Sequence, residues 1–142
     1  MVSFKRLTEG EMKAYSVDDD NEQSNKFRIR SNYFVRIAGI IGALAVIFGA
    51  FGNHVLDPNK EISDERKKVF AIGNFYHFVH ALALLGIPLT NKPTVVGLFF
   101  LTGISIFCGS CYITGITGNE GIAKITPYGG IAFILGWLCM LL

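Results

Sequence analysis

Four apolar stretches of about twenty residues each fill most of the chain after residue 32, and none of them contains an Asp or a Glu. The hydrocarbon core of a bilayer is about 30 Å thick and is crossed by about 20 helical residues. The pattern therefore predicts an all-α fold, an integral membrane four-helix bundle. The expected transmembrane domain covers residues 33–142, with spans at about 33–53, 69–89, 94–114 and 125–142.

The charge distribution supports this prediction. The chain has 13 basic and 11 acidic residues, and of these only Arg36 and Lys124 touch the edges of the apolar stretches. An apolar content of 51% exceeds that of an ordinary soluble domain. No basic surface for nucleic acid is expected. Three cysteines, with no early hydrophobic signal segment, fit free thiols better than a secreted disulfide framework.

Residues 1–32 have a different composition, with many charges and few large apolar side chains. Such a segment cannot build a core, so we expect a disordered N-terminal tail. A mitochondrial presequence is the alternative, but such segments are rich in Arg and poor in acids. The six acidic residues of this segment argue against a presequence.

The first span is rich in small residues, and four of its glycines recur at three- and seven-residue offsets. These offsets place the glycines along one stripe of a helix, where a neighbouring backbone can approach closely. Two more glycines, in the third and fourth spans, lie four residues after a small residue, Ser105 or Ala132, and indicate helix contacts. The glycines expected at helix contacts are Gly39, Gly42, Gly49, Gly52, Gly109 and Gly136.

Polar residues at membrane depth are the candidates for a functional site. The loops at about residues 55–68 and 115–124 lie on the same side of a four-span protein. Counted from that side, His77 and Cys108 are roughly 10 Å deep. His77 and His80 share a helix face, as do Cys108 and Cys111. The full set of candidates is His54, Asn74, His77, His80, Cys108 and Tyr112.

Two interpretations of this polar set stay open. Two histidines and two cysteines could bind zinc, and histidine pairs can ligate haem between helices. Alternatively, the imidazoles hydrogen-bond across helices and the cysteines pack as small apolar groups, which the sequence favours. For His80 we expect a neutral imidazole that faces the bundle interior and hydrogen-bonds to another helix. We expect no catalytic residue, bound metal or cofactor.

Several short motifs together resemble the transmembrane protein 256 family, the eukaryotic relative of a group of small bacterial inner-membrane proteins. They lie at residues 49–54, 77–85, 107–112 and 126–130, and at Gly136-Trp137. The resemblance covers about residues 34–142 and implies a four-helix multi-pass membrane protein. It implies no settled biochemical role.

Individual histidines fit the family pattern to different degrees. His54 and His80 match it, and His77 matches the animal-type pattern, where bacterial relatives usually have Gln. Cys111 departs from the usual apolar residue. These departures count against a shared His/Cys metal site.

We therefore expect a non-enzymatic multi-pass membrane protein that acts by packing with lipid or with a membrane partner. One alternative is a small metal- or haem-binding redox component that uses the intramembrane histidines. Another is a channel or carrier for a small solute. The expected partners are the lipid bilayer and either a membrane protein or a second copy of the chain. The organelle stays open between the mitochondrial inner membrane and the endomembrane system.

Overall fold

The computed structural model describes residues 9–142, and residues 1–8 lie outside the described part. The described residues form helices and turns, and no strand occurs among them. In chain order the elements are α1 (Glu9–Phe51), the π-helical turn η1 (Gly52–Leu56), α2 (Asp64–Gly86), the 3-10 turn η2 (Ile87–Leu89), α3 (Pro93–Gly103), the π-helical turn η3 (Ile104–Cys108), α4 (Gly109–Thr117), α5 (Glu120–Ala123) and α6 (Thr126–Cys139).

Within the described residues, four helical segments are long and apolar enough to cross a membrane, which confirms the expected all-α four-span architecture. The segments are Asp19–Leu56, Asp64–Leu89, Pro93–Thr117 and Glu120–Cys139. Pro93–Thr117 combines α3, η3 and α4, and we call it the third span. The helices begin before the apolar stretches because polar turns outside the lipid remain helical.

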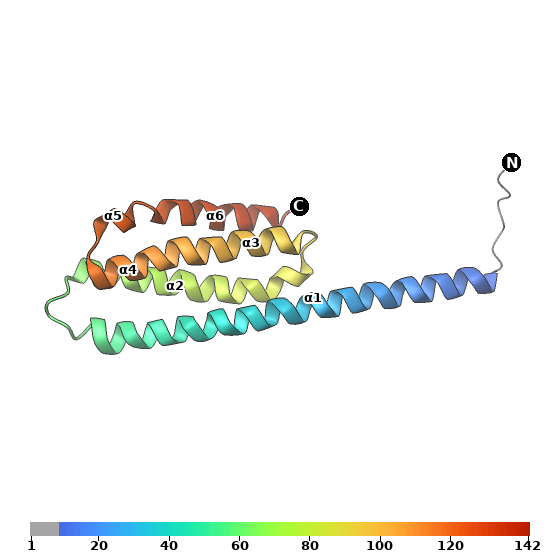
Figure 1. The fold of residues 1–142 in the computed structure, drawn as a ribbon, viewed down its shortest axis with the longest axis horizontal. Helices are drawn as coiled ribbons and strands as arrows, with labels where there is room; N and C mark the ends of the chain where they lie inside the picture. Colours follow the sequence, from blue (N-terminus) through green and yellow to red (C-terminus); the bar gives the residue numbers. More distant parts are fainter. Residues whose placement is uncertain (1–8) are drawn as a thin grey trace.

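The four spans run up and down and form a flattened bundle (Figure 1). α1 packs chiefly on α2, α2 packs on the third span, and α6 packs on the other side of the third span. The most deeply buried large side chains accordingly come from the two central spans: Leu84, Ile87, Val96, Phe100 and Cys108.

Large apolar side chains on the outer faces remain exposed within the bundle. Ile40 on α1 and Leu82 on α2 are 64% and 67% exposed, and Ile134 on α6 is 60% exposed. Lipid tails are as apolar as these side chains, so exposure costs little in a membrane. The helices must therefore be held together by close packing and hydrogen bonds rather than by burial from water.

The N-terminal part of α1 continues far beyond the bundle, on the side of the turn between α2 and α3 (Figure 1). The structure gives residues 9–32 a helical backbone. Residues 1–8 of the expected tail lie outside the described part, and disorder of residues 1–32 stays a prediction. The described side chains from Asp19 to Ile29 are exposed. Lys26 pairs with Glu22 one turn earlier, at 2.6 Å. Such i,i+4 pairs support a helix that has few packing contacts.

At the opposite end of the bundle, Arg66 links α2 to α4. Its Nε donates to the carbonyl oxygen of Gly115 at 3.1 Å, and its Nη2 donates to the carbonyl oxygen of Ile116. These carbonyls belong to the last turn of α4, where a cation also complements the helix dipole. α4 then ends at Gly118, whose φ of 73° is left-handed.

Glycine contacts differ from the sequence expectation in part. Methyl groups placed on Gly49, Gly52 and Gly136 would meet Asn74, Phe70 and Phe100, at 2.9, 2.9 and 2.5 Å respectively. Methyl groups on Gly39, Gly42 and Gly109 would meet nothing within 4 Å, so these three do not form close helix contacts within the bundle. The glycine spacing in the sequence did not predict several other close helix contacts. These are at Gly73, Gly97, Gly103, Gly115 and Gly129.

The error at Gly39 is one of helix rotation. The face of α1 that meets its neighbours contains Phe34, Ala38 and Ala45, which are 6%, 5% and 0% exposed. Gly49 and Gly52 continue this face, one turn and two turns beyond Ala45. Gly39 lies one residue past Ala38, about 100° around the helix, and faces outward.

Adjacent glycines at the start of α6 provide a direct test of close packing. A methyl group on Gly129 would lie 2.8 Å from the Cα of Phe107, whereas one on Gly130 would lie 3.8 Å from the Phe107 ring. Gly129→Ala should lower stability by about 1–3 kcal/mol, because a backbone cannot move aside as a side-chain tip can. Gly130→Ala is the matched control and should be near neutral. Thermal unfolding in detergent measures both, and equal melting temperatures would contradict this packing.

Candidate functional site: a cleft and a buried polar network

Asn74 joins three helices at membrane depth. It lies on α2, ten residues from the start of that helix at Asp64, or about 15 Å along its axis. Its Nδ2 donates to the carbonyl oxygen of Ala45 on α1 at 2.8 Å and to the hydroxyl of Tyr112 on α4 at 3.1 Å. One amide group therefore ties α1 and α4 to α2.

Tyr112 extends this network to His77. The Tyr112 hydroxyl lies 3.0 Å from His77 Nδ1, and the two side chains are 6% and 4% exposed. The hydroxyl accepts a hydrogen bond from Asn74 Nδ2, and its own proton can be donated to an unprotonated His77 Nδ1. The proton of a neutral imidazole then lies on Nε2. That buried atom has no hydrogen-bond partner among the described residues.

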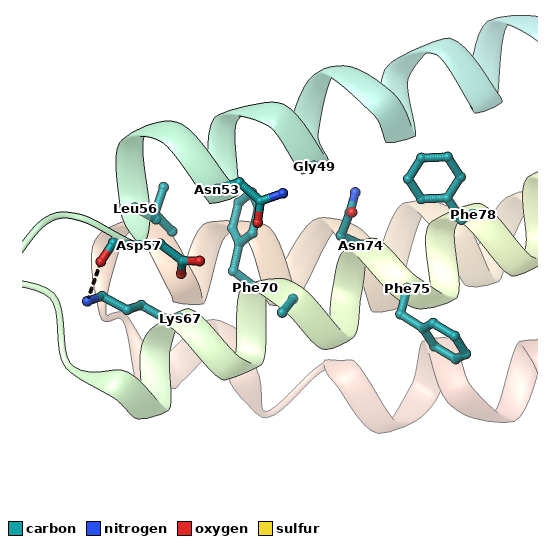
Figure 2. A pocket seen from close by; sticks show the side chains of 11 residues that line it. Gly49, Asn53, Leu56, Asp57, Lys67, Phe70, Asn74, Phe75 and Phe78 are labelled. Carbon is teal, nitrogen blue, oxygen red and sulfur yellow. Dashed lines mark hydrogen bonds between the residues drawn. The ribbon is translucent and has the colours of Figure 1, made fainter.

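A cleft of about 480 Å³ lies in front of Asn74, between α1 and α2. Its loop-side end is polar, with Asn53, Asp57 and Lys67 (Figure 2). The remaining lining is mostly small or aromatic: Gly49, Gly52, Leu56, Phe70, Ala71, Asn74, Phe75 and Phe78. The cleft thus changes from polar to apolar as it enters the membrane.

Two features keep the cleft open. Gly49 has no side chain, and a methyl group there would lie 2.9 Å from Asn74 Oδ1. At the polar end, Lys67 Nζ donates to the backbone carbonyl of Asp57 at 2.8 Å. Figure 2 shows the Lys67 ammonium drawn to that carbonyl, while the Asp57 carboxylate points away from it. The Asp57 carboxylate forms no ion pair within residues 9–142 as described.

His80 belongs to a second, separate polar contact. Its Nδ1 donates to the Tyr76 carbonyl oxygen at 2.8 Å, and its Nε2 accepts from Trp137 Nε1 on α6 at 3.2 Å. Its ring stacks on Phe133 with centroids 3.5 Å apart. Both ring nitrogens are therefore used in a neutral imidazole. This is the inward-facing, interhelical arrangement that the sequence suggested, with Trp137 as a partner that it did not indicate.

The remaining candidates do not join either contact. His54 lies in η1 and is exposed, whereas Cys108 and Cys111 are buried free thiols. His77 faces Tyr112 and His80 faces α6, so the two histidines do not converge. Among the described residues, no group of three or more His, Cys, Asp or Glu side chains is placed to hold a metal ion.

Comparison with known proteins agrees with this architecture. Residues 48–130 match the model of DUF423, a protein family of unknown function. The chain belongs to this family. The UPF0382 membrane protein YwdK of Bacillus subtilis is 38% identical over 112 residues, which are 74% of this chain and 89% of YwdK. The UPF0382 inner membrane protein YgdD of Escherichia coli is 31% identical over 117 residues, 78% of this chain and 88% of YgdD.

A third relative, the UPF0382 membrane protein SAB0533 of Staphylococcus aureus, is 34% identical over 114 residues, 77% of this chain and 92% of its own length. No solved structure matches the chain. The DUF423 match begins at Phe48 and so includes the cleft, most of the polar network and His80, but ends before Phe133 and Trp137.

The network of this DUF423 protein can be tested at Tyr112. Tyr112→Phe removes the hydroxyl between Asn74 and His77 and leaves His77 Nδ1 buried without a partner. The free energy of unfolding should fall by about 1–2 kcal/mol. Tyr76→Phe is the control, since no hydrogen bond of the Tyr76 hydroxyl occurs in the described part of the chain. Chemical unfolding in detergent measures both variants, and equal losses would contradict the network.

The His80 contact can be tested by fluorescence, because Trp137 is the only tryptophan of the chain. His80→Ala should change the emission of Trp137 and lower stability by about 1–2 kcal/mol, since an interhelical hydrogen bond and a ring stack are lost. His54→Ala should change neither quantity because His54 is exposed. An unchanged emission spectrum in His80→Ala would refute the contact.

Proposed function

We propose that this protein acts without catalysis, as a membrane-embedded helical bundle that binds an amphipathic lipid in the cleft between α1 and α2. The proposal rests on the division of the cleft lining into a polar end and an apolar end. Asn53, Asp57 and Lys67 form its polar end, and Phe75 and Phe78 lie at its apolar end. A lipid has the same division, between its head group and its chains.

The position of the cleft supports this occupant. Its polar end is built by η1 and the loop before α2, where the chain leaves the membrane. Its apolar end reaches the depth of Asn74 and beyond. Phe75 and Phe78 are 64% and 37% exposed, so the cleft opens sideways to the lipid. A lipid could enter from the bilayer without crossing the protein.

The use of the deep polar groups favours a non-enzymatic role. Asn74 and Tyr112 bond to each other, and His80 bonds to Trp137 and to its own helix backbone. Hydrogen bonds of this kind join helices in a membrane, where unpaired polar groups are costly. Relatives named only as membrane proteins fit this proposal.

We also propose that the chain represents the eukaryotic branch of the family, the transmembrane protein 256 proteins. The motifs at residues 49–54 and 77–85, with His77 in the second, support this placement. A membrane protein partner or a second copy of the chain would meet the outer faces of α1 and α6, where large apolar side chains are exposed.

Filling the cleft tests the proposal. Ala71→Leu adds a side chain at an exposed position of the cleft lining, and Gly49→Leu blocks the cleft from α1. Both variants should lose co-purifying lipid, measured by mass spectrometry of protein extracted in mild detergent. Gly39→Leu is the control, since a methyl group there meets nothing within 4 Å.

Gly49→Leu also displaces Asn74 and should unfold more easily, so Ala71→Leu decides the question. Its melting temperature should stay near that of the unmodified protein while the bound lipid falls. Equal lipid content in Ala71→Leu and Gly39→Leu would reject the cleft as a lipid site.

A further inference from the structure

We propose that the lipid in this cleft carries a primary-amine head group, as an aminophospholipid does. This inference rests on the proposed function, since it names the lipid class that the same cleft would select. It is drawn from the hydrogen-bonding groups and charges at the polar end.

The cleft offers acceptors that the protein itself does not use, two at its polar end and one deeper, at Asn74. No hydrogen bond to Asn74 Oδ1 or to the side chain of Asn53 occurs in the described part of the molecule, although Asn74 Nδ2 makes two. The Asp57 carboxylate likewise has no ion pair there. All three side chains line the cleft. A ligand that fits them must donate hydrogen bonds and carry positive charge.

A primary ammonium group meets both requirements. It has three N–H donors and one positive charge, so it can donate hydrogen bonds and pair with the Asp57 carboxylate. Hydrogen bonds to charged groups are also the stronger kind. The ammonium would pair with Asp57, and the amide oxygens of Asn53 and Asn74 lie along the same cleft.

The Lys67 ammonium would pair with the phosphate of such a head group. Its side chain is 18% exposed, and its ammonium is held beside the Asp57 backbone. The cleft lining at the polar end therefore has one cation, Lys67, and one anion, Asp57, which matches a zwitterion, although Lys67 also lies 3.9 Å from the Asp64 carboxylate outside the lining. An anionic lipid without an amine would offer nothing to Asp57.

Choline lipids have the same charges but should bind less well. A quaternary ammonium has no N–H, so Asp57 and the two amide oxygens would lose contact with water without gaining a hydrogen bond. We expect this to weaken binding about tenfold, which corresponds to about 1.4 kcal/mol. Stepwise methylation of the amine removes one donor at a time and so isolates this effect.

The experiment uses the full-length protein in detergent and phosphatidylethanolamine with zero, one, two or three N-methyl groups on identical acyl chains. Native mass spectrometry measures how much of each lipid is bound in pairwise competition. The unmethylated lipid should be favoured about tenfold over the trimethylated one, and the preference should fall with each methyl group. Asp57→Asn should remove most of this preference.

Glu61→Gln is the matched control, because Glu61 is an exposed acid of the same loop that does not line the cleft. It should keep the full preference. Equal binding of all four lipids, with all of them displaced by Ala71→Leu, would overturn the amine inference and leave the lipid cleft standing. Failure of Ala71→Leu to displace any lipid would overturn both. A preference that survives in folded Asp57→Asn would also overturn the role of Asp57.

Discussion

Phenylalanine rings seated on glycines of neighbouring helices are the contacts on which this bundle depends. Phe34 packs on Gly97, Phe70 packs on Gly115, and Phe100 packs on Gly136. Phe133 meets Gly103 in the same way, whereas Gly129 lies against the backbone of Phe107. In lipid there is no water to drive helices together, so close van der Waals contact must do so. A glycine provides the gap and a large flat ring fills it.

The cleft between α1 and α2 is the place where this pattern stops. Gly49 and Gly52 face α2 as the other glycines face their neighbours, and Phe70 meets Gly52. At Gly49 the opposite residue is Asn74, whose amide is held by the Ala45 carbonyl and by Tyr112. The amide contacts Gly49 as closely as Phe70 contacts Gly52, but it is a polar group rather than a ring. A polar group at membrane depth therefore borders an open cleft, and the proposed lipid site follows from that combination.

Much of the polar chemistry at membrane depth was visible in the sequence as residue types. The sequence marked Asn74, His77, His80 and Tyr112 as deep polar groups, and the structure pairs three of them in one network. It did not indicate that His80 would bond to Trp137. Nor did it indicate the groups at the mouth of the cleft, because Asn53, Asp57 and Lys67 look like ordinary loop residues.

The sequence by itself determined the number of spans, their lengths and their up-and-down order. These follow from a local property, the run of apolar residues needed to cross a bilayer, and from short connecting turns. Only the tertiary structure decided which face of each helix meets its neighbour. Gly39 and Gly49 look alike in sequence, yet one faces outward and the other faces Asn74. The rotation of a helix about its axis is set by all of its contacts together, and no stretch of α1 alone contains that information.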